Sequence, residues 1–423
     1  MNKIAATVVI KNAGQLVTLE GPGEIGPRGG KAMSELGIVK RGAVAFAGSR
    51  VVAVGETAKL LKMVAITRRT KVIDAERRLV TPGLVDCHAH PVFAGNRAHE
   101  FEMRLQGKSY LDIAKAGGGI KSTVAATRKA SPKKLYANGR RVLDEMLRWG
   151  VTTVEGKSGY GLTVKDELKM LRVLKQLGRE HDVDIISTFL GAHEIPEEYK
   201  NNTEKYVGLV CGEMIPAVVA ENLADFCDVF CEKGVFSTKQ TRIIMQTAQA
   251  FGMKLKLHAD QFYSTGGAEL AAEFNAVSAD HLDCVNKEGI HLMKKAGVIP
   301  VLIPGCVFWL KMKRKAPARK MIDEGLPVAI GTDFNPGSSP IQAMPIAMSL
   351  ACLEFNMTPA EVLTAATLNA AHAIDWGDRV GSLSPGKKAD AVIWDAEDFR
   401  EIPYWFGKNL AHRVFKDGHE VQL

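Results

Sequence analysis

Cysteine is sparse in this chain and does not form the pattern of a disulfide-stabilised protein. Only seven of the 423 residues are cysteine, an odd number, and they are scattered along the sequence. Small secreted domains instead carry dense, even sets of cysteines. Cys227 and Cys231 form the closest pair, but no second Cys/His pair follows at zinc-finger spacing. We therefore expect buried thiols on a strand rather than half of a zinc site.

Long apolar runs are also absent. The longest candidate, residues 296–310, is shorter than the roughly 20 residues of a membrane span, and two prolines and a glycine interrupt it. At the N-terminus, Lys3 and Lys11 flank only a short apolar stretch, which is not the pattern of a secretory signal. We therefore expect a cytoplasmic protein with no membrane partner.

Neither sign of charge is in large excess, since 55 basic and 47 acidic residues leave a formal net charge of +8. Residues 311–320 carry six of the positive charges, a run that is typical of a solvated loop. Because no nucleic-acid-binding module is recognisable, this balance predicts no nucleic-acid partner. It remains compatible with a small anionic substrate.

What the sequence does contain, after residue 80, is an alternation of short apolar strands with helical segments. We expect strands at residues 80–88, 152–158, 184–193, 226–232, 254–260, 276–282, 298–304 and 327–333. We expect helices at residues 133–149, 166–180, 238–251 and 266–274, and a capping box at residues 358–361 begins another. Eight strands alternating with helices predict an α/β fold, a (β/α)8 TIM barrel.

The two ends of the chain have a different pattern. Residues 1–80 and 381–423 contain short alternating strands, such as those at 6–10, 51–54 and 390–394. Neither piece alone has enough strands to bury a core. We therefore expect a composite β domain, a small β-sandwich of residues 1–80 and 381–423, beside a barrel of residues 81–380.

Polar residues end several of the predicted strands. The active sites of (β/α)8 enzymes lie at the carboxyl ends of the strands, and His88, His90, His258 and Asp333 all fall there. The His-x-His spacing puts His88 and His90 on one face of their strand, where both can bind one metal ion. Three imidazoles and a carboxylate suit Zn²⁺, and Fe²⁺ also accepts them. The sequence therefore predicts one divalent metal ion bound by these four residues.

The remaining histidines divide by position. Five of the eleven, at positions 88, 90, 193, 258 and 281, end predicted strands, and we expect structural roles for the other six. Asp86 has the same strand parity as His88. It can hydrogen-bond a ligand imidazole from behind, and a buried structural carboxylate is the alternative.

Two motifs resemble those of the amidohydrolase superfamily. They are Thr81-Pro82-Gly83-Leu84-Val85-Asp86-Cys87-His88-Ala89-His90 and Pro385-Gly386-Lys387-Lys388-Ala389-Asp390. Six narrower motifs are similar to those of the imidazolonepropionase family, and the resemblance extends over nearly the whole chain. They are Phe93-Ala94-Gly95-Asn96-Arg97, Gly117-Gly118-Gly119-Ile120, Lys157-Ser158-Gly159-Tyr160-Gly161-Leu162, Leu190-Gly191-Ala192-His193, Ser278-Ala279-Asp280-His281-Leu282 and Thr332-Asp333-Phe334-Asn335-Pro336-Gly337-Ser338-Ser339-Pro340.

This resemblance implies a reaction, the hydrolysis of 4-imidazolone-5-propionate to N-formimino-L-glutamate in histidine degradation. A cyclic amide is opened at its carbonyl, and a metal ion would acidify the attacking water and polarise that carbonyl. Asp333 fits the role of proton shuttle, and His281 fits that of an oxyanion-stabilising or proton-transferring group.

The resemblance also implies substrate contacts and a homodimer. Arg97 and Tyr160 would bind the propionate, with His193, Asn335 and Gly337 lining the rest of the substrate. The alternatives are a surface position for Arg97, aromatic packing for Tyr160 and turn formation for Asn335.

One position departs from the family. The family usually has a glutamate three residues after the histidine of strand five, where this chain has Gln261. Glutamine can orient water but cannot transfer a proton, and losing a general acid/base costs about 10²–10⁴-fold in rate. The alternatives are therefore a transfer of this role to Asp333 or His281, a harmless variation, or an amidohydrolase or aminohydrolase that acts on another small cyclic amide or amidine. A non-catalytic binding protein of the same fold is a further alternative.

Overall fold

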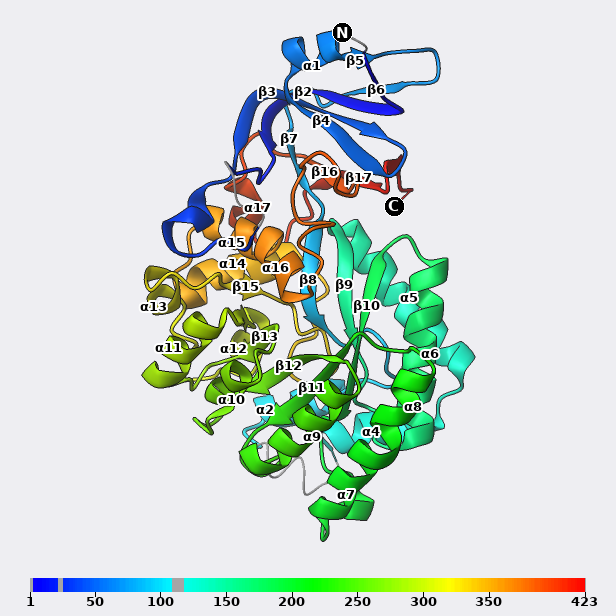
Figure 1. The fold of residues 1–423 in the computed structure, drawn as a ribbon, viewed down its shortest axis with the longest axis vertical. Helices are drawn as coiled ribbons and strands as arrows, with labels where there is room; N and C mark the ends of the chain where they lie inside the picture. The colour runs from blue at the N-terminus through cyan, green and yellow to red at the C-terminus, as the bar shows by residue number, and fades with distance from the viewer. Residues whose placement is uncertain (1–2, 22–25, 109–117, 423) are drawn as a thin grey trace.

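The computed structural model describes residues 3–21, 26–108 and 118–422, in which a parallel barrel lies below a separate β-sheet domain (Figure 1). The predicted fold class is therefore confirmed. The strands of the barrel, in chain order, are β8 (Leu84–Ala89), β9 (Val151–Lys157), β10 (Asp184–Ala192), β11 (Phe226–Cys231), β12 (Lys254–Ala259), β13 (Ser278–His281), β14 (Ile299–Leu302) and β15 (Ala329–Ile330).

The barrel strands pair in chain order, each parallel to the next. Backbone hydrogen bonds from Asp333 N to His88 O (2.8 Å) and from His90 N to Phe334 O (2.9 Å) join the last strand to the first. This closure brings residues at the two ends of the barrel sequence side by side. The predicted ligands on the first and eighth strands therefore become neighbours.

All eight predicted barrel strands are present, but the first prediction, residues 80–88, joined two strands that belong to different sheets. The chain forms β7 (Leu79–Pro82) in the β-sheet domain and then β8 in the barrel. Gly83 separates them. A Cβ atom on Gly83 would lie 2.2 Å from Thr152 Oγ1, so the backbone crosses between sheets at a place where only glycine fits.

Helices surround the barrel and follow its strands. They are α2 (Ala98–Leu105), α4 (Ile120–Lys129), α5 (Pro132–Arg148), α6 (Val164–Glu180), α7 (Thr203–Leu209), α8 (Ile215–Ala220), α9 (Thr238–Ala250), α10 (Gly267–Glu273), α11 (Lys287–Ala296), α12 (Pro304–Trp309), α13 (Ala318–Asp323), α14 (Met344–Phe355), α15 (Pro359–Ala365) and α16 (Leu368–Ala373). The capping box at Thr358 and Glu361 is present and begins α15, as predicted. The four predicted helices correspond to α5, α6, α9 and α10.

The second large sheet combines strands from both ends of the chain. In spatial order its strands are β18 (His419–Glu420), β17 (Ala411–Lys416), β16 (Ala391–Trp394), β7, β2 (Val8–Val17), β3 (Ile38–Ala47) and β4 (Arg50–Glu56), with β6 (Lys71–Asp74) paired to β2. Two short strands, β1 (Ile4–Ala5) and β5 (Val64–Ala65), pair beside it, and two helices, α1 (Thr57–Met63) and α17 (Glu401–Tyr404), complete this part. We propose the division into residues 1–80 with 381–423 and residues 81–380, although β7 crosses the first boundary by two residues.

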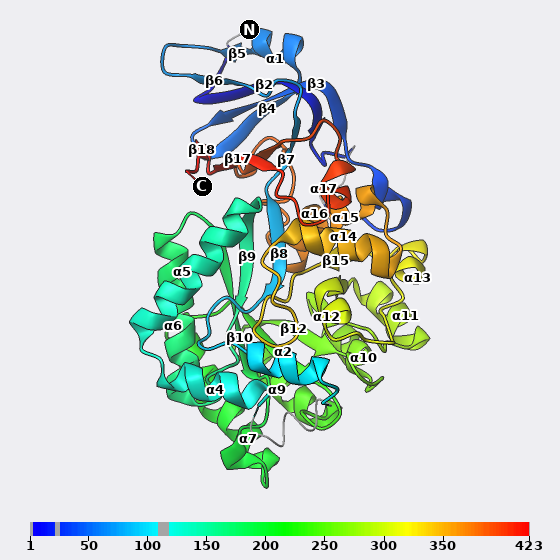
Figure 2. The ribbon, with the colours of Figure 1, turned by 180° about the vertical axis from the view of Figure 1, so that it is seen from behind.

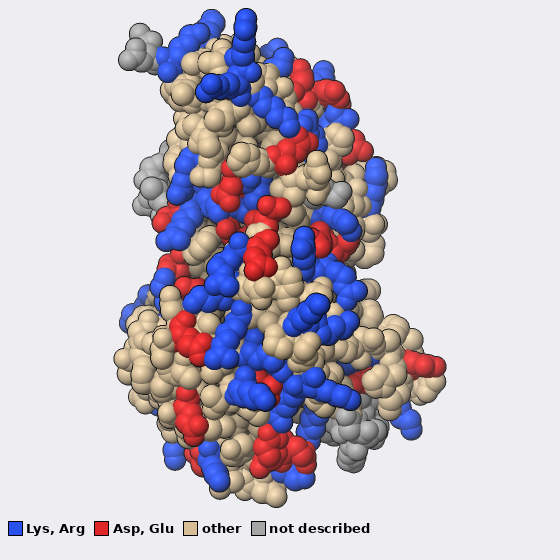
Figure 3. All heavy atoms as spheres, turned by 90° about the vertical axis from the view of Figure 1, so that its right-hand side faces the viewer, with Lys and Arg blue, Asp and Glu red and all other residues tan. Residues whose placement is uncertain are grey.

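On the side of the molecule that α5 and α6 form, basic and acidic side chains are intermixed, and neither charge sign covers that face alone (Figure 3). Several of these charges are paired, for example Arg172 with Glu221 at 2.6 Å. Among the described residues, no helix is both long and apolar enough to cross a membrane.

Candidate active site

A cavity of about 120 Å³ opens at the carboxyl end of the barrel, the end that faces away from the β-sheet domain (Figure 2). Helices α2 and α4 lie across this end. The lining includes most of the predicted site residues, namely His90, Arg97, Tyr160, His193, His258, Gln261, His281, Asp333, Asn335 and Gly337. His88 lies behind them and is fully buried. The structure therefore brings all the predicted site residues to one place.

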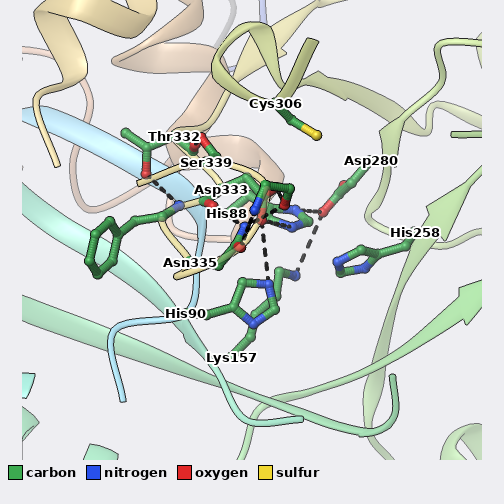
Figure 4. Close-up of polar contacts among 12 residues, drawn as sticks. His88, His90, Lys157, His258, Asp280, Cys306, Thr332, Asp333, Asn335 and Ser339 are labelled. Atoms are coloured by element: carbon green, nitrogen blue, oxygen red, sulfur yellow. Dashed lines mark hydrogen bonds and ion pairs between the residues drawn. The ribbon is translucent and has the colours of Figure 1, made fainter. Parts of the chain in front are cut away.

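His88, His90 and Asp333 converge at the bottom of the cavity (Figure 4). Asp333 Oδ1 lies 3.6 Å from His88 Nε2 and 3.5 Å from His90 Nε2. His258 forms one triad with His88 and His281 and another with His90 and His193, and within each triad the possible ligand atoms lie within 4.8 Å of one another. Four polar side chains from strands β8 and β12 and from the end of β15 thus surround one point.

Two buried carboxylates hold the imidazole rings from behind. Asp280 Oδ2 lies 2.5 Å from His88 Nδ1, and Asp228 Oδ2 lies 2.9 Å from His258 Nδ1. A carboxylate beside Nδ1 favours the tautomer with its proton on that nitrogen. Each ring therefore keeps a lone pair on Nε2, the atom that can bind a metal ion.

Asp86 takes the second of its two expected roles. Its carboxylate accepts hydrogen bonds from Thr332 Oγ1 (2.5 Å) and Thr332 N (3.0 Å), while Asp280 occupies the position beside the imidazole of His88. Of the two alternatives for Asp86, this geometry favours the buried structural carboxylate. Its strand parity is that of His88, but its side chain lies one layer deeper and fixes the loop that carries Asp333.

Two residues of the site lie at strand ends with left-handed backbone conformations. The φ angles are 75° at His281 and 51° at Asp333. Such conformations cost roughly 1–3 kcal/mol for residues other than glycine and concentrate at functional sites. At His281 and Asp333, the turn directs the side chain into the cavity instead of letting the strand continue.

Burial sets the protonation of the site. It holds the pKa values of His88, His90 and His281 well below the usual value, so these imidazoles are neutral near pH 7. It also raises the pKa of Asp333 to about 7. Neutral imidazoles are metal ligands or hydrogen-bond donors, and a carboxyl group with a pKa near neutrality suits proton transfer.

Arg97 presents its guanidinium group to the cavity from the start of α2. Its Nε donates a hydrogen bond to Thr123 Oγ1 (2.9 Å). Gly337 makes room for the rest of the group, since a Cβ atom there would lie 2.1 Å from Arg97 Nη1. The guanidinium is therefore held at a fixed position on the wall of the cavity, as the binding of a carboxylate requires.

Tyr160 and His193 form an aromatic wall beside His90. The His193 ring stacks on that of His90, with centroids 5.1 Å apart and planes at 12°, and Tyr160 lies 5.6 Å from His90. His193 Nδ1 lies 3.1 Å from Gly159 O, which leaves Nε2 as the free nitrogen of the ring. A flat substrate ring fits against such a wall.

The side chain of Asn335 forms its hydrogen bonds within its own loop. Its Nδ2 donates to Asp333 O (2.7 Å) and to Ser338 Oγ (2.8 Å), and its Oδ1 accepts from Gly337 N and Ser338 N, both at 2.8 Å. The amide therefore uses its full hydrogen-bonding capacity within the turn. This geometry favours the turn-forming alternative and makes Asn335 the residue that shapes the loop around Asp333.

Gln261 lines the cavity, and its amide donates a hydrogen bond from Nε2 to Cys306 Sγ at 3.4 Å. Cys306 in turn lies within 4.8 Å of the polar atoms of His281 and Asp333. Position 261 thus faces the same space as the two residues that can transfer protons.

The carboxylates behind the histidines and two buried lysines were not predicted. Glu155, Lys157, Asp228, Lys256 and Asp280 all point into the barrel and are fully buried. A signal was present, because Glu155 and Lys157 stand at alternating positions of an apolar strand, as do Ser278 and Asp280. Charged residues spaced by two on a buried strand share its interior face.

The donor set fits a divalent cation. His88 Nε2 is buried and has no hydrogen-bond partner among the described residues, which is costly for a polar atom unless a ligand binds it. Two ligands about 2.1 Å from a tetrahedral ion lie about 3.4 Å apart, close to the distances of 3.5 and 3.6 Å from Asp333 to the two imidazoles. Three imidazoles and one carboxylate are also a ligand set of the kind that divalent metals prefer.

The chain is similar to known proteins over nearly its full length. The sequence model of the amidohydrolase family matches residues 79–421. Imidazolonepropionase of Brevibacillus brevis is 51% identical over 97% of this chain and 97% of the relative, and that of Geobacillus kaustophilus is 50% identical over the same shares. Imidazolonepropionase of Alkaliphilus metalliredigens is 49% identical over 98% and 97%.

Solved structures of lower sequence identity share the fold. An adenosine deaminase of Xanthomonas campestris with bound zinc has a TM-score of 0.71 at 19% identity and covers 99% of this chain and 93% of its own. A triazine hydrolase variant has a TM-score of 0.71 at 17% identity, with 98% and 94% covered.

Proposed function

This chain belongs to the imidazolonepropionase family of amidohydrolases, and we propose that the cavity at the carboxyl end of its barrel is where the substrate ring opens. The chain hydrolyses imidazolonepropionate in histidine degradation and breaks a cyclic amide C–N bond. The observation that carries the assignment of the site is that Asp333 lies within 3.6 Å of both His88 Nε2 and His90 Nε2, beside a cavity that also presents Arg97.

A divalent metal ion is the cofactor, and His88, His90, His258 and Asp333 would hold it. When bound, it polarises the ring carbonyl and lowers the pKa of a water molecule. We propose Zn²⁺, for which three imidazoles and a carboxylate are a common set, with Fe²⁺ as the alternative. Elemental analysis of the purified protein distinguishes the two.

The protein's own residues divide the work of hydrolysis. Asp333 accepts a proton from the attacking water and delivers it to the ring nitrogen as the C–N bond breaks. The neutral imidazole of His281, whose buried Nδ1 has no hydrogen-bond partner in the described part of the chain, is placed to donate to the oxygen that gains charge. Gln261 orients these groups without transferring a proton. Nothing in the comparisons favours the alternatives of another cyclic substrate or a non-catalytic protein.

Arg97 and Tyr160 would bind the propionate arm, while His193 and the loop of Asn335 and Gly337 shape the space around the ring. We also propose a cytoplasmic location, which the free state of all seven cysteines supports, and a homodimer. The mass in solution, measured by light scattering, tests the dimer.

The direct test of the function is the loss of absorbance of imidazolonepropionate on addition of the metal-loaded protein. We expect turnover that disappears on treatment with a chelator and returns with Zn²⁺ or Fe²⁺, together with N-formimino-L-glutamate as the product. Full activity of the metal-free protein would contradict the proposed metal site, and another product would contradict the substrate.

Arg97→Ala is expected to raise KM for imidazolonepropionate by about 10–100-fold with a smaller effect on kcat, since a hydrogen-bonded charge pair contributes roughly 1.5–3 kcal/mol. The change removes the guanidinium that Thr123 holds at the cavity wall. KM and kcat are measured for the natural substrate and for an analogue with a neutral amide in place of the carboxylate. Equal losses on both substrates would rule out a role for Arg97 in carboxylate binding. Arg97→Lys keeps the positive charge but loses the planar guanidinium group that can bind both carboxylate oxygens. Its KM should lie between those of the parent chain and Arg97→Ala.

A further inference from the structure

Five charged side chains fill the inside of the barrel directly behind the proposed metal ligands. They are Glu155, Lys157, Asp228, Lys256 and Asp280, and each is fully buried. Lys157 Nζ lies at the centre of this group, 2.7 Å from Glu155 Oε1, 2.8 Å from Asp228 Oδ2 and 3.6 Å from Asp280 Oδ2. Figure 4 shows Lys157 beneath His88 and His90, with its ammonium group directed at Asp280.

Two of the carboxylates in contact with Lys157 also hold the imidazole rings. Asp280 contacts His88 Nδ1 through the same oxygen, Oδ2, that faces Lys157. Asp228 also uses one oxygen, Oδ2, for both His258 Nδ1 and Lys157. One ammonium group therefore connects two carboxylate–imidazole pairs that come from four different strands.

We propose that Lys157 is a positioning residue for the active site and that, through Asp280 and Asp228, it fixes the orientation and the tautomer of His88 and His258 together. This inference rests on the proposed function, because it takes these two histidines as metal ligands. Lys157 contacts neither the metal nor the substrate, and it acts only through the two carboxylates.

The physical reason lies in the repulsion between the carboxylates. Asp228 and Asp280 are buried in the same small space, where like charges interact strongly. The ammonium group between them offsets that repulsion and lets each carboxylate stay within hydrogen-bonding distance of an imidazole. Without it, the carboxylates can lower their repulsion by rotating apart or by taking up a proton. Either change loosens the imidazole that depends on them.

Lys256 provides a matched comparison inside the same network. It is equally buried and lies 2.8 Å from Glu155 Oε2 and 3.9 Å from Asp280 Oδ2. Its other partners are the backbone oxygens of Cys87 and Ala373, both at 3.1 Å. Lys256 therefore has the burial and the charge of Lys157 but makes no ion pair with Asp228, so a purely structural role predicts similar effects of the two lysines.

The test measures Zn²⁺ affinity by competition with a chelator, and the absorption spectrum of the Co²⁺-substituted protein, for Lys157→Met and Lys256→Met. We expect Lys157→Met to weaken Zn²⁺ binding by about 10–100-fold, the usual effect of losing support behind a metal ligand, and to change the Co²⁺ spectrum. Lys256→Met should lose thermal stability while its metal affinity stays close to that of the parent. Equal losses of affinity in the two variants, or none in Lys157→Met, would overturn the proposal.

A second set of variants tests the inference if Lys157→Met does not fold. Asp228→Asn and Asp280→Asn preserve shape and remove one contact of Lys157 each. Because both act through the same ammonium group, we expect the double variant to lose less Zn²⁺ affinity than the product of the two single losses. Losses that multiply independently would mean that Lys157 does not link the two histidines.

Zn²⁺ binding by the parent chain and by His258→Ala distinguishes a failure of the role of Lys157 from a failure of the proposed metal site. If the parent chain binds no Zn²⁺, or if His258→Ala binds it as tightly as the parent, the metal site itself is wrong. If the parent binds Zn²⁺ through His258 but Lys157→Met behaves like Lys256→Met, only the role of Lys157 is wrong.

Discussion

His258→Ala is expected to abolish metal binding and to lower kcat/KM by roughly 10³-fold or more, because the metal supplies several kcal/mol of charge stabilisation and each 1.36 kcal/mol is a factor of ten in rate. The change removes one of three imidazoles and leaves Asp228 without its partner at 2.9 Å. Metal content per chain and turnover of imidazolonepropionate are measured on the same preparation. The two should fall together.

The matched control is His291→Ala. His291 is exposed on α11, outside the cavity, and we expect its loss to leave metal content and rate unchanged. A His258→Ala protein that keeps both the metal and the parental rate would exclude His258 from the ligand set. Loss of metal in both variants would point instead to a general defect in folding, which circular dichroism would show.

Asp333→Asn is expected to lower kcat by about 10²–10⁴-fold, the usual cost of losing a general acid/base. Asparagine preserves the shape of the side chain and can still place an oxygen beside His88 and His90, but it cannot accept and release a proton. Asp333 is the carboxyl group at the bottom of the cavity, and burial raises its pKa to about 7. kcat is measured at saturating metal, so that weaker binding of the ion does not account for the loss.

Gln261→Glu, assayed beside it, tests where proton transfer takes place. Because Asp333 and His281 already line the cavity, a carboxyl group at position 261 should change kcat by less than about tenfold. The new carboxyl group would also lose the hydrogen bond that Gln261 donates to Cys306. If Gln261→Glu raises kcat by several hundredfold while Asp333→Asn leaves it unchanged, the proton shuttle lies at position 261 and not at Asp333.

Much of the barrel could be predicted from local patterns. Strands such as Ile299–Leu302 are short apolar runs, and helices such as α15 begin at a capping box that four consecutive residues define. The joined prediction at residues 80–88 was wrong because Leu79–Pro82 and Leu84–Ala89 are both apolar and extended. Only the close approach of Gly83 to Thr152 separates them, and this contact depends on the packing of β9.

The site residues with a local signal were also found from sequence. His88 and His90 are two residues apart on one strand, and this spacing alone places both rings on one face. For Asn335 the sequence left two alternatives, and the hydrogen bonds of the amide within residues 333–338 favour the turn. Asp86 shared the parity of His88, but parity gives the face of a strand and not the depth of a side chain within the barrel.

The sequence by itself determined the alternation of eight strands with helices, the strand ends that carry polar side chains and the residue types of the proposed ligand set. The tertiary structure decided which carboxylate holds which imidazole. Asp280 lies 192 residues from His88 in sequence yet 2.5 Å away in space, and Lys157 joins it to Asp228. Strand patterns repeat every two residues and carry only local information, whereas these pairings follow from barrel closure and from the need to pair charges buried away from water.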